Sequence, residues 1–138
     1  MTTMYDISFD EEAGLLEIRL TGFWTTEIVH AFHRDYLAAV DRYSPRFPQF
    51  PTVSDSRGFA VMSTEANEAF LKGARETAQR HTGRIAVVFQ SQIAKLQAER
   101  TARILNEGVA QPRPQRFFTE VSEARSWALN EDVLDGRI

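Results

Sequence analysis

The residues best suited to chemistry in this sequence form the short run Asp55-Ser56-Arg57-Gly58. Asp and Ser side chains cap turns and Gly accepts a positive φ, so turn formation alone can explain the run. The run also follows a short extended stretch that begins at Thr52, which places it at the carboxyl end of a predicted parallel strand. Because partners of open α/β sheets usually contact that edge, these four residues are a candidate loop for contact with a partner.

Two other arrangements of residues could carry out chemistry, but the sequence supports each of them less. His30 and His33 stand three residues apart, close enough on one helix to share a metal ion, but no third ligand is positioned beside them. We therefore expect no metal site and no cofactor, and we expect His81, near a helix end, to act as a cation that suits the helix dipole. A Ser-His-Asp site could assemble from Ser56, Asp55 and a histidine of that helix. The sequence has no Gly-x-Ser-x-Gly elbow, however, and nothing in the spacing requires such a site.

Several apolar residues fall in expected loops or at the ends of expected elements. We favour the interpretation that they cover the ends of the core; the alternative is an exposed patch that binds a partner or a lipid-like ligand. The candidate loop runs from Asp55 to Met62, which is one of these apolar residues. These residues are Phe23, Trp24, Phe47, Phe50, Phe59 and Met62.

The elements that must position these residues alternate between strand and helix patterns. Period-2 alternation over residues 5–9 and 16–20, with a turn at 11–14, predicts a β-hairpin. Helical spacing and short extended stretches then follow one another to the end of the chain. After the hairpin we expect a helix capped by Thr25 or Thr26 and reaching Tyr43, and then a strand at 52–55. Next come a helix capped by Ser63 or Thr64 and stopped by Gly83, and a strand at 85–89. The chain continues with a helix, a strand at 116–119 and a last helix capped by Thr119; the apolar stripe of the first of these two helices is Ala94, Ala98, Ala102, Leu105 and Val109.

Composition is that of one domain spanning residues 1–138, with a polar, frayed tail at 130–138. The chain has no cysteine, which excludes disulfides, thiolate metal sites and a cysteine nucleophile. A net charge of −3 argues against a nucleic-acid partner. No apolar run approaches the roughly 18 residues of a membrane span, and no signal peptide is visible, so we expect a cytoplasmic protein.

Four stretches resemble the SpoIIAA-like group of the STAS fold, the domain of sporulation anti-sigma-factor antagonists and of transporter tails. They are Leu20-Thr21-Gly22-Phe23-Trp24, Asp55-Ser56-Arg57-Gly58, Arg84-Ile85-Ala86-Val87-Val88-Phe89, and the ending from Phe117 to Trp127. The order of elements matches over nearly the whole chain. The resemblance implies an α/β domain with a mixed sheet of about five strands, an N-terminal β-hairpin and about four helices.

The resemblance also implies a function. In antagonists of this fold, a kinase phosphorylates a serine that follows an aspartate, and the added charge breaks the complex with the partner. Ser56 occupies the matching position, although Arg57 replaces a second serine and the next helix is expected about five residues late, at Ser63. A phosphate would add about 1.5 to 2 negative charges, which Arg57 could pair. We therefore expect a non-enzymatic regulatory module that binds an as yet unknown protein.

Two other functions stay open at this stage. A carrier of a small apolar ligand would need an enclosed cavity of at least ~300 Å³ under Phe47, Phe50 and Phe59. A small hydrolase ranks last, because no nucleophile is visibly activated. A homodimer through the edge of the hairpin or through exposed aromatic residues is compatible with each of these three functions.

Overall fold

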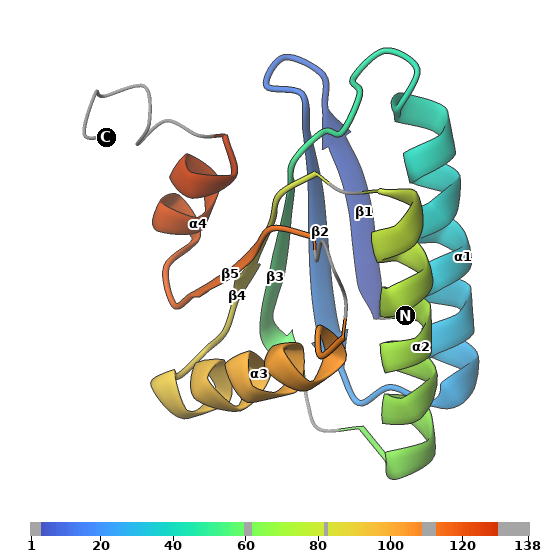
Figure 1. Ribbon diagram of the computed structural model, residues 1–138, viewed down its shortest axis with the longest axis vertical. Helices are drawn as coiled ribbons and strands as arrows, with labels where there is room; N and C mark the ends of the chain where they lie inside the picture. Colours follow the sequence, from blue (N-terminus) through green and yellow to red (C-terminus); the bar gives the residue numbers. More distant parts are fainter. Residues whose placement is uncertain (1–3, 60–61, 82, 109–112, 130–138) are drawn as a thin grey trace.

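The computed structural model describes residues 4–59, 62–81, 83–108 and 113–129, and it contains a five-stranded sheet between helices (Figure 1). Strands follow one another across the sheet in chain order; β1 is antiparallel to β2, and every later pair of neighbours is parallel. This confirms the predicted mixed sheet, hairpin and four helices, whereas the expected frayed tail lies outside the described residues. The elements are β1 (Tyr5–Asp10), β2 (Leu15–Gly22), α1 (Thr26–Tyr43), β3 (Thr52–Phe59), α2 (Thr64–Arg80), β4 (Ile85–Val88), α3 (Gln92–Leu105), β5 (Gln115–Phe118) and α4 (Val121–Ala128).

Helices α1 and α2 pack side by side on one face of the sheet, and α4 packs on the other (Figure 1). Right-handed crossovers between parallel strands that are laid down in one direction put the crossover helices on the same face. The short α4, which follows the last strand, is therefore left to cover the opposite face. The core under α1 and α2 contains Leu16, Ile18, Leu20, Trp24, Val29, Phe32, Tyr36, Val40, Phe50 and Ala66. The core under α4 contains Leu15, Val53, Ala86, Val88, Ala124 and Ala128.

Helix α3 lies differently, beyond the carboxyl ends of the strands, at the bottom of Figure 1. Its first turn is capped by Ser91, whose Oγ accepts a hydrogen bond of 3.1 Å from the backbone N–H of Ala94. The predicted stripe of Ala94, Ala98 and Ala102 is half-buried. Val109 lies outside the described residues.

The boundaries confirm two predicted caps and overturn another. Thr25 and Ser63 accept hydrogen bonds from the backbone at the starts of α1 and α2. The prediction that Thr119 caps the last helix is wrong, because α4 begins after Glu120, whose side chain makes no capping bond. Gly83 follows α2 after the C-cap residue His81, and a Cβ there would lie 2.4 Å from the carbonyl oxygen of Phe50.

The largest difference concerns the candidate loop. The run from Asp55 to Gly58 is not a loop, because β3 continues through it as far as Phe59. Pairing with β2 holds it extended: Arg19 is opposite Asp55, and after a bulge Gly22 is opposite Phe59. The polar residues concealed the strand, since short runs of Asp, Ser and Gly are typical of turns.

Candidate functional site

A hollow of about 440 Å³ opens where β3 ends and α3 begins. Two segments distant in sequence form it, the last residues of β3 and the connection from β4 into α3. Three of the four residues of the predicted run line it, so the predicted position at the carboxyl edge of the sheet is where the hollow lies. The lining residues are Ser56, Arg57, Gly58, Phe59, Phe89, Gln90, Ser91 and Ala94.

Asp55 and Arg57 form a clamp on the α4 side of β3. The guanidinium donates from Nε to Oδ1 at 2.8 Å and from Nη2 to Oδ2 at 2.7 Å, and the backbone N–H of Arg57 adds a bond of 3.1 Å to Oδ1. The hydrogen bonds from Arg57 hold the pKa of the Asp55 carboxyl below its usual value. Half of the Arg57 side chain is still exposed, so a held cation stands at the rim of the hollow.

Ser56 points to the opposite face of the strand. Consecutive residues of a strand alternate between faces, so Ser56 lies with Ser54, and their Oγ atoms are 3.5 Å apart. Only 5% of Ser56 is exposed. The expectation that Arg57 could pair with a phosphate on Ser56 is therefore wrong for this conformation, because the two side chains lie on opposite faces of β3 and Arg57 already binds Asp55.

The apolar candidates divide between core and surface. Trp24 is fully buried and donates from Nε1 to the carbonyl oxygen of Thr21 at 2.9 Å; Phe50 is buried as well. These two residues belong to the core, which agrees with the favoured interpretation, and they are removed from the alternative of an exposed patch. Half-buried residues packed against the same core are Phe47, Phe59 and Met62, while Phe23 is 57% exposed.

Large exposed apolar side chains are carried by elements at the carboxyl edge of the sheet. Phe23 directly follows β2, which ends beside the end of β3. The other large exposed hydrophobic residues in the described part of the chain are Ile93, Leu96 and Ile104, all on α3 and all at least 60% exposed. Sequence reasoning missed these three. The available signal was their position outside the alanine stripe, because a helix that is apolar on two sides has more apolar surface than one contact with its own domain requires.

A second polar cluster lies at the opposite end of the sheet, where Arg113 joins the amino ends of β3 and β4. Its Nε donates to the carbonyl oxygen of Gly83 at 2.7 Å and Nη1 donates to the hydroxyl of Tyr36 at 3.0 Å. Its Nη2 reaches Thr52 Oγ1 at 3.4 Å and His81 Nδ1 at 3.0 Å. This cluster was not predicted, because its members are scattered through the sequence.

The expectation that His81 acts as a cation at a helix end is wrong. The side chain is 1% exposed and its ring lies 4.2 Å from that of Phe50. Burial, together with the charge of Arg113, lowers the pKa of His81 to about 4. The imidazole is therefore neutral at pH 7, and its role is to pack and to accept a hydrogen bond.

The two histidines of α1 do not form a paired site. His30 is exposed, whereas His33 is buried with Nδ1 3.2 Å from the carbonyl oxygen of Val29. In the described ranges no three His, Cys, Asp or Glu side chains come together, and no histidine is hydrogen-bonded to a serine. Within the same residues, no helix has the length and apolar character needed to cross a membrane.

Comparison with known proteins supports the fold. No family model matches the chain, and no curated protein matches it. Among solved structures, an uncharacterised protein of the DUF3478 family with a SpoIIAA-like fold, from Shewanella loihica PV-4, is similar with a TM-score of 0.67. The alignment covers 90% of this chain and 91% of that one, at 18% sequence identity. The fold expected from the resemblance is thus confirmed.

Proposed function

We propose that this SpoIIAA-like domain is a non-enzymatic regulatory module that binds another protein at the carboxyl edge of its sheet. The observation that carries the proposal is the group of exposed apolar residues at that edge: Phe23 after β2, and Ile93 and Leu96 in the first turns of α3. The hollow at the end of β3 lies beside them, since the first turn of α3 helps to line it. We call Phe23, Ile93, Leu96 and Arg57 together the carboxyl-edge surface.

The energetics favour a protein partner for this surface. Covering one exposed Ile, Leu or Phe side chain contributes about 1.5 to 3 kcal/mol. Phe23, Ile93 and Leu96 supply exposed apolar surface of the kind that forms the centre of protein interfaces, and the held guanidinium of Arg57 supplies a charged group at the rim of the hollow. Helix α3 has no buried residue among those whose burial is described, so fewer of its side chains are tied to the core than in α1, α2 or α4.

Regulation by phosphorylation of Ser56 belongs to the same proposal, with one added step. The hydroxyl is buried in β3, so a kinase would reach it only after the end of β3 had separated from β2. A phosphate would then keep the strand end open, because a charge of about −1.5 to −2 cannot return to that site without a partner. The switch would thus act on the end of β3 rather than on a surface loop.

The test is capture of partners from the host with a tagged protein, followed by cross-linking. The variant Ile93→Glu/Leu96→Glu places two charges in the carboxyl-edge surface, whereas Gln97→Glu adds a charge at an exposed polar position of the same helix. A partner that is kept by the wild type and by Gln97→Glu, but lost by the double variant, supports the proposal. If every captured partner is kept by the double variant, the surface is not where they bind.

The carrier of a small apolar ligand is the alternative for the same hollow, because Phe59 and Phe89 line it. Native mass spectrometry of protein purified gently from its own host separates the two functions. A copurified small molecule that is lost in the variant Phe89→Glu would favour the carrier and contradict a pure interaction module.

A further inference from the structure

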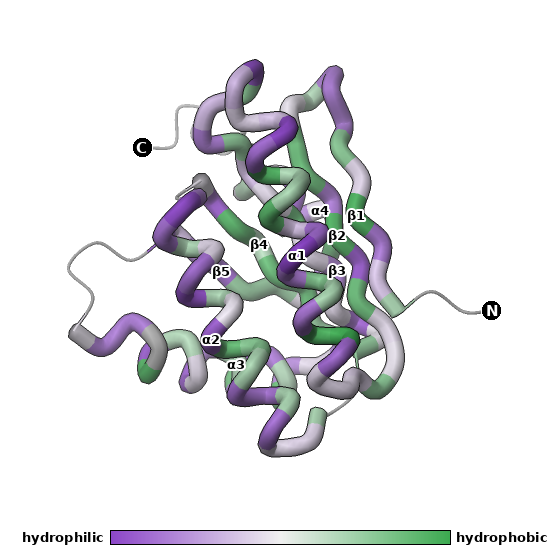
Figure 2. Tube along the Cα trace, turned by 90° about the vertical axis from the view of Figure 1, so that its right-hand side faces the viewer, coloured by the Kyte–Doolittle hydropathy of each residue, from purple (hydrophilic) through white to green (hydrophobic). Residues whose placement is uncertain are grey.

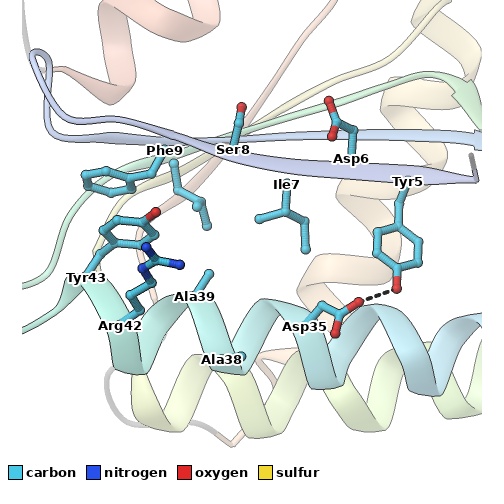
Figure 3. A pocket seen from close by; sticks show the side chains of 11 residues that line it. Tyr5, Asp6, Ile7, Ser8, Phe9, Asp35, Ala38, Ala39, Arg42 and Tyr43 are labelled. Atoms are coloured by element: carbon cyan, nitrogen blue, oxygen red, sulfur yellow. Dashed lines mark hydrogen bonds between the residues drawn. The ribbon is translucent and has the colours of Figure 1, made fainter.

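A second hollow, of about 400 Å³, runs along the outer edge of the sheet between β1 and α1 (Figure 3). Tyr5, Ile7 and Phe9 point from β1 toward the helix, and the small side chains of Ala38 and Ala39 form its floor. Asp6 and Ser8 point to the other face of the sheet. We call this hollow the edge groove.

The two ends of the edge groove differ in charge. At one end the hydroxyl of Tyr5 donates to Asp35 Oδ2 at 2.5 Å, and the exposed Arg34 donates from Nε to Asp35 Oδ1 at 3.2 Å. The bonds from Tyr5 and Arg34 lower the pKa of the Asp35 carboxyl, which is therefore ionised at neutral pH. At the other end Phe9 stacks on Tyr43 at 4.1 Å, beside the exposed guanidinium of Arg42. Within the described part of the chain, Arg42 makes no ion pair.

Strand β1 also has an open hydrogen-bonding edge. Figure 2 shows it at the outer border of the sheet, and among the described strands its neighbour is β2 alone. The carbonyl oxygen of Met4 accepts from the N–H of Thr21 on β2. Backbone groups alternate in direction along an antiparallel strand, so Tyr5, Ile7 and Phe9 direct their N–H and C=O groups outward. These are the same residues whose side chains face the edge groove.

From this geometry we infer that the edge groove and β1 are the binding surface for a second copy of this chain. The two β1 strands pair antiparallel about a two-fold axis, with Ile7 opposite its own copy and Tyr5 opposite Phe9 of the second copy. In this register each outward-facing residue exchanges both backbone hydrogen bonds with its opposite residue. A shift of the register by two residues would leave one outward-facing residue of each β1 strand without a partner.

Charge complementarity selects a second copy as the occupant. Asp35 precedes Ala38 in α1 by as many residues as Arg42 follows Ala39, so the two charges are placed symmetrically about the floor of the groove. An axis through Ile7 therefore brings the Tyr5–Asp35 end of one groove to the Phe9–Arg42 end of the other. Opposite charges meet twice, as an isologous contact requires. The result is one continuous sheet in which the exposed edge is paired, which removes an edge that could otherwise aggregate.

Disulfide trapping tests the register directly, because the chain has no cysteine of its own. In the inferred dimer Asp6 is opposite Ser8 of the second copy in a non-hydrogen-bonded pair, where the Cα atoms are about 4.5 Å apart, within reach of a disulfide. Both residues are exposed. We expect a mixture of Asp6→Cys and Ser8→Cys proteins to form a cross-linked heterodimer under mild oxidation, well above the level of either protein alone. Cross-linking of Asp6→Cys alone as strong as that of the mixture would overturn the register.

A charge reversal tests the pairing without cysteines. We expect Arg42→Glu to weaken the dimer about tenfold in sedimentation or light scattering, and salt to weaken the wild-type dimer. Arg103→Glu, an equal charge change at an exposed position of α3, should leave the dimer unchanged. A protein that stays monomeric up to about 1 mM and gives no mixed disulfide overturns the inference. Binding of an unrelated extended peptide by such a monomer would give the groove to a different partner.

Discussion

Nη2 of Arg113 lies 3.0 Å from Nδ1 of His81, and this contact fixes the tautomer of the histidine. A guanidinium can only donate, so Nδ1 must accept and the ring proton must be on Nε2. Protonation of Nδ1 would place two cations in contact inside the protein. Burial and this contact together keep His81 neutral, while the other hydrogen bonds of Arg113 connect the amino ends of the strands.

Stability should fall in mild acid because of His81. Its pKa is about 4 in the folded protein and about 6.5 in the unfolded chain, so the unfolded state takes up the proton first as the pH falls. The loss begins near pH 6.5 and is complete near pH 4, and it amounts to about 3 kcal/mol. Urea unfolding at several pH values measures it.

The matched variants are His81→Gln and His30→Gln. The first removes the titrating group, so the difference between its pH profile and that of the wild type should contain this fall. The second changes an exposed histidine remote from Arg113 and should retain the fall that belongs to His81. Parallel profiles for wild type and His81→Gln would show that His81 does not titrate as described.

Arg113→Lys should destabilise the protein by about 2 kcal/mol, although the charge is retained. One ammonium cannot reach Gly83, Tyr36, Thr52 and His81 together, and a buried acceptor left without a partner costs about 1 to 3 kcal/mol. Urea unfolding compares this variant with Arg103→Lys on the exposed side of α3, for which we expect no change. Equal stability of the two variants would mean that Arg113 does not connect the strands.

Gly73→Ala should destabilise the protein by about 2 kcal/mol, despite the better helix propensity of alanine. The new Cβ would lie 2.4 Å from Nδ1 of His33, whose buried ring also packs against Phe70. In a His33→Ala background the clash is gone, so the same change should instead stabilise by up to about 1 kcal/mol. A double-mutant cycle by thermal or urea unfolding measures the sign reversal. If both backgrounds respond alike, α1 and α2 do not approach at this point.

Ser56→Asp should unfold the end of β3 rather than act as a neutral mimic of phosphoserine. The carboxylate would enter a site that is 5% exposed, and we expect a loss of about 3 kcal/mol or more. Ser91→Asp is the control, because aspartate replaces serine well at the N-cap of α3. Thermal unfolding and amide exchange of β3 report the effect. Wild-type stability in Ser56→Asp would restore the accessible switch that the sequence suggested.

The sequence predicted the elements well because their signals are local. Alternation in the hairpin, the caps at Thr25 and Ser63, and the apolar run of β4 each depend on residues within a few positions. The extension of β3 was missed because pairing with β2 overrides the turn preference of Asp55 to Gly58.

The candidate site was predicted in place but not in form. The position at the carboxyl edge followed from the order of elements, whereas the burial of Ser56 depends on the direction of each side chain in β3. The link from Arg113 to His81 joins residues 32 positions apart, and no local pattern encodes it. The exposure of Ile93, Leu96 and Ile104 was not predicted, because it depends on how much of α3 the rest of the domain covers.

The order of the strands has a consequence for how the protein is made. Each strand lies beside the one that precedes it in the chain, so a growing polypeptide could add strands one at a time to a neighbour already in place. Helix α4 leaves the ribosome after all five strands, and until then Val53, Ala86 and Val88 lack the helix that packs against them on that face of the sheet. A chain halted before α4 would expose this apolar face, and we expect chaperones to hold such chains.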